Sequence, residues 1–238
     1  MSRMQEYGEL VSAGSGIWIR EGEWYESVFR RRMTVMALQN GDVLVHNPFV
    51  MKDADLKSLQ TLGKRVGLVV PNALHGDEAG GMASRLKELG SEVQVWVPAA
   101  MVKKVEKQCK VQGTLENDWP TAWAESVKCL PVQGLRIIHE SVFFHQISRT
   151  LVVTDLVFNM EPRDFRSNLE RTLMRWNRVG QGLGPSWLCD HLFTRDLKAR
   201  QRSLEEILSW DFDRVVMNHG HVVHQGGKKL MKQAFGIL

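Results

Sequence analysis

Apolar positions near the start of the chain form short runs, a pattern typical of strands rather than helices. Residues 33–38 and 43–46 are two such runs, and Asn40-Gly41 lies between them. This dipeptide predicts a β-hairpin, because both of its residues accept the positive φ of a type I′ turn. Residues 16–19 extend the predicted antiparallel ribbon upstream.

The next part of the chain alternates strand and helix patterns. Residues 53–62 have leucines at helical spacing, with Asp53 as the predicted N-cap, and Gly90 closes a second helix. Alternation of this kind is the signature of α/β layering. The predicted elements are a helix over 53–62, a strand over 66–70, a helix over 82–89, a strand over 93–97 and a helix over 99–110.

The second half repeats the ribbon and adds helices. Two apolar runs, 141–145 and 150–154, predict a second hairpin, and apolar residues at near-helical intervals predict a helix over 162–177. The pattern assigns no element to 113–133. One ribbon in each half, with helices outside, favours a two-sheet sandwich over a doubly wound sheet. The last predicted elements are a helix over 204–210, a strand over 214–217 and a helix over 228–235.

Composition is that of an ordinary globular protein. Hydrophobic residues make up 43% of the 238 residues and charged residues 24%, which suits one domain over residues 1–238. No apolar stretch reaches the roughly 20 residues that span a bilayer, and the first residues lack the apolar core of a secretory signal. We therefore expect a cytoplasmic protein with no membrane partner. Its three cysteines are expected to be reduced and buried.

The formal net charge is +4, and the basic residues occur in short groups. Because none forms a long basic run, we expect solvated helix faces and loop ends, and a nucleic-acid partner is the less favoured alternative. The groups are Arg30 to Arg32, Lys103 and Lys104 with Lys107 and Lys110, and Lys228 and Lys229 with Lys232.

Candidate chemistry follows the predicted strand 66–70, where ligand sites are common in α/β folds. His75, Asp77 and Glu78 place an imidazole and two carboxylates within four residues. Zinc, iron and manganese accept such mixed nitrogen and oxygen ligands. The alternative is that Asp77 or Glu78 only stabilises the N-terminus of the next helix.

Further polar residues lie at strand ends. His139 precedes the strand 141–145, Asp155 follows the strand 150–154, and His219 follows the strand 214–217. His145 lies within an apolar run, where a histidine is more often a hydrogen-bonded core residue than a ligand. His221 and His224 are expected at the surface.

The sequence resembles the metallo-β-lactamase superfamily, whose first motif reads H-x-H-x-D-H-x-G-G after a buried strand. Laid on residues 73–81, the motif matches His75, Asp77 and both glycines, but Ala73 and Glu78 stand where histidines belong. The later histidine of the family corresponds to His139, its bridging aspartate to Asp155 and its last histidine to His219. The resemblance implies an α/β fold, a four-layer αββα sandwich.

The sequence resembles one branch of that superfamily, a domain of unknown function, more closely than it resembles the superfamily as a whole. Its P-N-x-x-H element matches residues 71–75, and its E-x-V-F-F-H-x-x-S-R-T-L-x-x-T-D element matches residues 140–155. Together with Phe212 to Val216 ahead of the His-Gly turn, the matches span roughly residues 33–235, which is most of the chain.

The resemblance implies a metal-dependent hydrolase with an altered site. Ala73 removes one ligand, so a single divalent ion (zinc, iron or manganese) is expected, activating water for hydrolysis of a small-molecule ester, lactone, thioester or phosphodiester. Asp77 or Asp155 would orient the hydroxide and take up its proton. The implied ligands are His75, Asp77, Glu78, His139, Asp155 and His219.

Two alternatives stay open. In one, the site has decayed, holds no metal, and the protein acts by binding. In the other, the protein is an RNA-processing relative, since the fold also hosts nucleases and the scattered lysines would contact phosphates.

Overall fold

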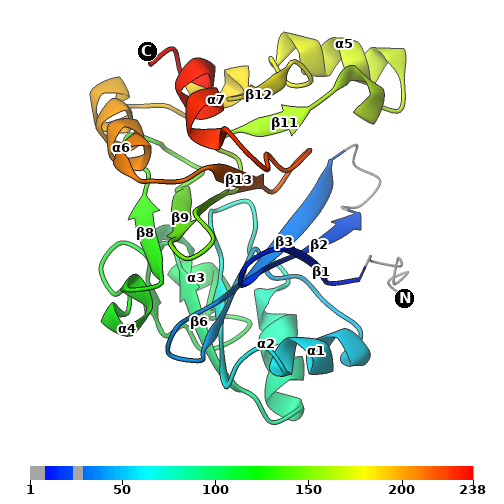
Figure 1. Cartoon of the computed structure of the whole chain (residues 1–238), viewed down its shortest axis with the longest axis vertical. Coiled ribbons are helices and arrows are strands. Elements are labelled where there is room, and N and C mark those ends of the chain that lie inside the picture. The colour runs from blue at the N-terminus through cyan, green and yellow to red at the C-terminus, as the bar shows by residue number, and fades with distance from the viewer. Residues whose placement is uncertain (1–8, 24–28, 238) are drawn as a thin grey trace.

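The structure, a computed structural model, describes residues 9–23 and 29–237. Two β-sheets pack face to face with helices on both outer surfaces (Figure 1). Within the described residues, the larger sheet contains seven strands, which lie side by side in chain order. They are β1 (Val11–Gly14), β2 (Ile17–Glu23), β3 (Arg30–Ala37), β4 (Val43–His46), β5 (Arg65–Val69), β6 (Glu92–Val97) and β7 (Gly113–Thr114).

The predicted first ribbon is confirmed, with a different turn. Strands β1 to β4 pair antiparallel, and Leu38 N–H donates to the carbonyl of Asp42 across a three-residue loop. Gly41 alone has a positive φ in this loop, 84°, so the turn is not the expected type I′. Asn40 instead accepts a hydrogen bond from Asp42 N–H, which closes the loop locally.

Strands β4 to β7 are parallel and are connected by helices, as the alternating pattern predicted. Asp53 is the first residue of its helix and not the cap, because Lys52 has the extended backbone of the N-cap position. The helix predicted over 99–110 is much shorter. The connections are α1 (Asp53–Gln60), α2 (Ala79–Glu88), and η1 (Ala99–Met101) with α3 (Val102–Val105).

The smaller sheet, in the part of the chain that the structure describes, has four strands in the order β13-β10-β9-β8. The second predicted hairpin is confirmed, and the strand predicted over 214–217 pairs parallel with β10. The unassigned middle segment supplies β8 and the short helix α4. The bounds are α4 (Thr121–Ala124), β8 (Val127–Pro131), β9 (Ser141–His145), β10 (Thr150–Val153) and β13 (Arg214–Met217).

Helices α6 (Leu197–Ser209) and α7 (Gly227–Ala234) lie at the opposite end of the molecule from α1 and α2 (Figure 1). A two-stranded ribbon carries the helix predicted over 162–177, which is interrupted at Phe165. Ser167 begins the longer part with a capping box to Glu170. These elements are β11 (Phe158–Met160), η2 (Pro162–Asp164), α5 (Asn168–Trp176), β12 (Gly182–Gly184) and η3 (Leu188–Leu192).

Side-chain alternation along the strands builds three apolar layers. In β4, Val43 and Val45 face the core beneath α1 and α2, whereas Leu44 faces the second sheet. In β10, Leu151 faces the core beneath α6, whereas Val152 faces the first sheet. Because each sheet buries both faces, the order of layers is αββα, as the sequence resemblance implied.

The unassigned segment also fills the layer between the sheets. Trp123 is buried there, and Trp119 packs against the same cluster. Gly67 in β5 makes room for the Trp123 ring, since a Cβ at this position would lie 2.6 Å from Cη2 of that ring.

The three cysteines are free, as expected, but only Cys189 is buried, while Cys109 and Cys129 are half-buried. Among the described residues, no helix has the length and apolar character needed to cross a bilayer.

Candidate metal centre

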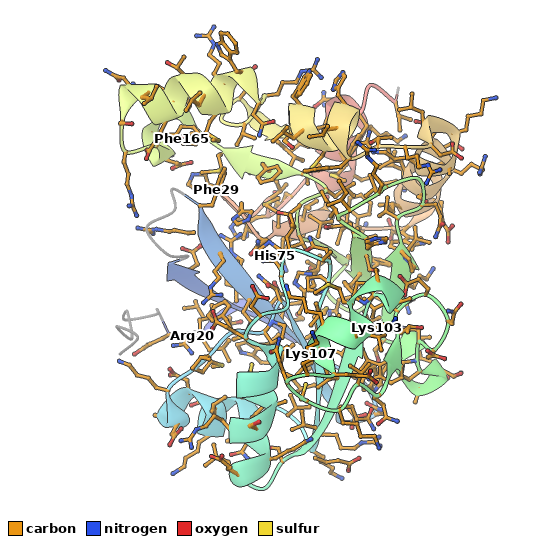
Figure 2. All side chains as sticks on the ribbon, turned by 180° about the vertical axis from the view of Figure 1, so that it is seen from behind. Arg20, Phe29, His75, Lys103, Lys107 and Phe165 are labelled. Carbon is orange, nitrogen blue, oxygen red and sulfur yellow. The ribbon has the colours of Figure 1, made fainter. Side chains whose placement is uncertain are left out.

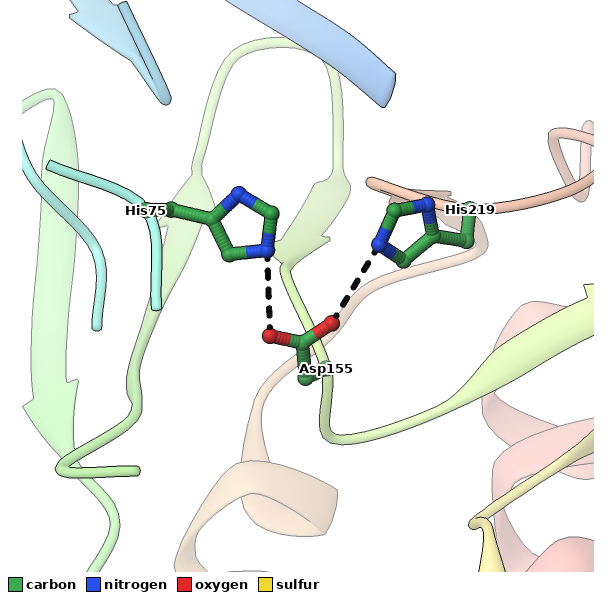
Figure 3. Close-up of side chains that lie close together, drawn as sticks. All are labelled: His75, Asp155 and His219. Carbon is green, nitrogen blue, oxygen red and sulfur yellow. Dashed lines mark ion pairs between the residues drawn. The ribbon is translucent and has the colours of Figure 1, made fainter. Parts of the chain in front are cut away.

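Three side chains from both sheets meet at one end of the sandwich. His75 lies in the loop after β5, Asp155 follows β10, and His219 follows β13. All three are buried. Figure 3 shows the Asp155 carboxylate between the two imidazoles, with one oxygen toward each ring.

Distances within the group suit a shared cation. Nε2 of His75 lies 3.2 Å from one oxygen of Asp155, and Nε2 of His219 lies 3.5 Å from the other. One ligand atom from each residue lies within 4.8 Å of the other two. Two ligands about 2.1 Å from one tetrahedral metal ion are separated by roughly 3.4 Å. The donor set of two imidazoles and one carboxylate therefore fits zinc, iron or manganese.

His219 is held in the tautomer that a metal ligand needs. Its Nδ1–H donates to the carbonyl of Arg30 at 2.7 Å, and its ring stacks on Phe158. Burial lowers the pKa of His219 to about 4, so the ring is neutral and Nε2 presents a lone pair. That lone pair lies 3.5 Å from a carboxylate oxygen of Asp155 and 2.8 Å from the side-chain nitrogen of Asn218.

Asp155 is ionised despite its burial. Burial alone would raise its pKa, but His75, His219 and the amide of Asn72 outweigh this effect and hold the pKa at about 2. Nδ2 of Asn72 donates to Asp155 at 2.7 Å. The carboxylate is thus negative at neutral pH and has a fixed orientation.

A second buried carboxylate, that of Glu140, lies next to Asp155 and binds its backbone N–H. Glu140 accepts hydrogen bonds from the backbone N–H groups of Thr154 and Asp155 and from Nδ2 of Asn72. Burial and the nearby charge of Asp155 raise the pKa of Glu140 to about 7. Asn72 connects the two carboxylates, so their positions depend on one another.

The side-chain amide of Asn218 also reaches the centre. Its oxygen accepts from Arg32 N–H and from Nδ2 of Asn47, so its nitrogen must point the other way. This nitrogen lies 3.2 Å from Nε2 of His75 and 2.8 Å from Nε2 of His219. The amide therefore competes with a metal ion for Nε2 of His219.

The other three residues predicted as ligands lie outside this group. Asp77 is 72% exposed and pairs with Lys104 at 2.7 Å. Glu78 pairs with Arg31 at 2.6 Å and accepts from Val50 N–H. The loop turns outward after His75, so Asp77, also predicted to orient the hydroxide, is not at the centre.

His139 is exposed, whereas Glu140 directly after it is buried. The backbone at His139 has a positive φ of 50°, so the chain is not extended at this residue. His145 is the hydrogen-bonded core histidine that the sequence favoured, with Nε2–H donating to the carbonyl of Ala37 at 2.9 Å. His221 and His224 are exposed, as predicted.

Sequence reasoning missed the residues that orient the group. Asn72 and Glu140 lie inside the two motifs that carry the family resemblance, and that position was the available signal. Asn218 directly precedes His219 but has no pattern of its own. His46 was also missed: it is buried, with Nε2 3.0 Å from Oγ1 of Thr154, and burial together with His75 lowers its pKa to about 3.

A pocket of about 310 Å³ lies beside the centre, with Asn218 and Gly220 in its lining. Arg30, Arg31 and Arg32 line it as well. The expectation that this basic group is solvated is wrong for Arg31 and Arg32, which are buried. Arg32 donates to the carbonyls of Met217 and Gly220 and pairs with Glu21, so it ties β3 to the loop that holds His219.

No protein-family model matches the chain, and no curated protein matches it in sequence. Solved structures do match. The metallo-β-lactamase DIM-1 has a TM-score of 0.61 and 16% identity over 96% of this chain and 98% of its own. FIM-1 from Pseudomonas aeruginosa, solved in its mono-zinc form, has a TM-score of 0.59 and 11% identity over 94% and 93%.

A putative diflavin flavoprotein fragment from Nostoc has a TM-score of 0.64 and 10% identity over 98% of this chain and 95% of its own. These likenesses show that the chain has the metallo-β-lactamase fold, and the four αββα layers agree with them.

Proposed function

We propose that the protein is a metal-dependent hydrolase that binds one divalent ion through His75, Asp155 and His219. The observation that carries this proposal is the pair of short contacts from Asp155 to the two imidazoles. FIM-1, which has the same fold, was solved with a single zinc, so one ion is compatible with this architecture.

Each residue has a defined part. His219 is fixed by the Arg30 carbonyl so that Nε2 points at the ion, and Asn72 orients the Asp155 carboxylate. Bound there, a divalent ion supplies a Lewis acid that makes water a nucleophile at neutral pH. Asp155 is the carboxylate at the centre and the candidate acceptor of the proton that water releases. The substrate is proposed to be an ester, lactone, thioester or phosphodiester.

We also propose that the chain belongs to the domain-of-unknown-function branch of the superfamily. Support comes from convergence of the two motifs: Asn72 and His75 of the first, and Glu140 and Asp155 of the second, form one buried network. Motifs that are far apart in sequence but contact one another at one site are expected of a functional signature.

Metal content measured by elemental analysis tests the proposal. Tag-free protein purified without chelator is expected to contain about one equivalent of zinc, iron or manganese, because one site offers three ligands. Asp155→Ala and His219→Ala are expected to lose the metal while circular dichroism shows a retained fold.

His139→Ala and Asp77→Ala are the matched controls. Both residues were predicted as ligands from sequence and lie outside the group, so both variants are expected to keep the metal. Folded protein that holds no metal even after reconstitution would contradict the proposal. Loss of metal in the two control variants, with retention in Asp155→Ala, would place the site elsewhere.

A further inference from the structure

Helix α5 carries an apolar stripe that faces away from the protein. Leu169, Leu173 and Trp176 lie at i, i+4 and i+7, which places them on one face of the helix. They are 70%, 55% and 81% exposed, and no residue of α5 is buried. The sequence pattern correctly predicted a helix, but its apolar stripe does not contribute to the core.

The stripe continues onto the next segment of chain. The backbone carbonyl of Asn177, which ends α5, accepts from Trp187 N–H at 2.8 Å, and its side-chain oxygen accepts from Leu188 N–H. Exposed apolar residues of η3 therefore lie beside the end of the helix. We call the combined surface the α5 patch; it consists of Leu169, Leu173, Trp176, Trp187 and Leu188.

Scattered exposed leucines are ordinary, but a contiguous group with two tryptophans marks an interaction site. The element that carries it projects from the body: α5 lies at the outer edge of the molecule, above β11 (Figure 1). The stripe is thus presented on a raised helix, with its inner side held by the half-buried Met174 against a small core that includes Phe165.

The segment that carries α5 is positively charged. Residues 166–178 contain Arg166, Arg171, Arg175 and Arg178 against the single acid Glu170, a formal charge of +3. Asp190 of η3 pairs with Arg178 at 3.7 Å and lowers the charge of the two segments together to +2. A second copy of the chain would bring two such basic rims together across a twofold axis, which is unfavourable. An anionic surface would be attracted to the same rim.

We propose that the α5 patch docks on an anionic lipid bilayer surface. Leucine and tryptophan on one face of a helix, with arginines on the rest, is the composition of helices that lie in the membrane interface. Such a helix needs no membrane-spanning segment. Tryptophan suits the interface because its ring is apolar and its N–H is polar. The proposal is independent of the metal centre.

Co-sedimentation of the full chain with vesicles tests the proposal. The protein is expected to sediment with vesicles of mixed phosphatidylcholine and phosphatidylglycerol and much less with phosphatidylcholine alone. The triple variant Leu169→Ser, Leu173→Ser, Trp176→Ser is expected to bind at least about tenfold more weakly, since three apolar side chains no longer enter the interface. Because these side chains are exposed, the variant should fold, as checked by thermal melting.

Two matched controls separate the patch from general surface effects. Val11→Ser with Ile147→Ser removes exposed apolar residues elsewhere and is expected to leave binding unchanged. Arg175→Gln with Arg178→Gln is expected to weaken binding by about fivefold per arginine. Lys103→Gln with Lys107→Gln removes the same charge at a position far from Phe165 (Figure 2) and is expected to have little effect.

Failure to bind anionic vesicles, or equal binding by the wild type and the triple variant, would overturn the proposal. Light scattering of the protein alone provides a second readout. A dimer that the triple variant disrupts would also overturn the proposal, because the patch would then be covered by a second copy of the chain.

Discussion

The amide nitrogen of Asn218 lies 2.8 Å from Nε2 of His219, on the side of the ring that a metal ion would occupy. The oxygen of the same Asn218 amide accepts hydrogen bonds from Arg32 N–H and from Nδ2 of Asn47. The amide therefore cannot flip without leaving these two buried donors unpaired. A metal ion must therefore displace this amide before it can bind both imidazoles.

Exchanging the amide for a carboxylate tests this competition. Asn218→Asp keeps the oxygen that accepts from Arg32 N–H and replaces the competing N–H donors with a potential ligand. We expect zinc affinity to rise at least about tenfold, within the range over which groups next to a metal change its affinity. Competition with a chromophoric chelator measures the change, and a fall in affinity would show that the amide supports the site.

The buried carboxylate of Glu140 is surrounded by N–H donors. In Glu140→Gln, the new amide N–H group must face at least one of these donors, so the free energy of unfolding should fall by about 1–3 kcal/mol. Urea denaturation measures this loss. Glu161→Gln removes an exposed carboxylate that pairs with Arg163 and should change stability by less than about 0.5 kcal/mol. Similar losses in both variants would contradict the prediction.

His46 should make the fold sensitive to moderate acid. Its pKa is lowered from 6.5 to about 3, so between these pH values the unfolded chain binds a proton that the folded protein excludes. Stability from this residue is complete above about pH 6.5 and falls with decreasing pH by about 1.4 kcal/mol per pH unit. His46→Phe should flatten the dependence, measured by urea denaturation across this pH range.

The raised pKa of Glu140 acts in the opposite direction, so the informative quantity is the difference in slope between the wild type and the His46 variant. His224→Phe changes an exposed histidine and serves as the control. An unchanged slope in His46→Phe would show that this residue takes up its proton in the folded state.

The layer between the sheets has no room beside Gly67. A Cβ there would lie 2.6 Å both from Cη2 of Trp123 and from Cδ2 of Leu44, so Gly67→Ala should lower the free energy of unfolding by about 1–3 kcal/mol. Gly184→Ala is the matched control, since nothing lies within 4 Å of its added Cβ. Thermal melting distinguishes the two variants, and equal melting temperatures would contradict the packing argument.

The strands and most helices could be predicted because their apolar residues repeat with the period of the element. The pattern could not predict whether the apolar face of each element packs against the core or faces solvent. The spacing of Leu169, Leu173 and Trp176 predicted a helix correctly, but periodicity is the same whether the stripe meets a core or solvent. The boundaries of the helix predicted over 99–110 failed for a related reason, because apolar spacing alone does not mark where a helix ends.

Motif positions pointed to His75, Asp155 and His219, which the structure brings together. Asp155 and His219 follow strands directly, and strand ends have a fixed direction. Asp77 and Glu78 lie in a loop whose path is set by tertiary partners, Lys104 and Arg31, that no local pattern reveals. The role of Asn218 could not be predicted for the same reason, because it depends on Arg32 and Asn47, which are distant in sequence.

The centre draws His75 from the larger sheet and Asp155 and His219 from the smaller one. If the proposed ion binds there, its affinity depends on the spacing between the two sheets. Changes of a few tenths of an ångström in that spacing alter the donor distances, even when the substitution lies deep in the inter-sheet layer around Phe143 and Val152. Substitutions far from the ligands that leave the protein folded should thus lower the affinity for the proposed ion, by an amount that depends on how much they change the spacing between the sheets.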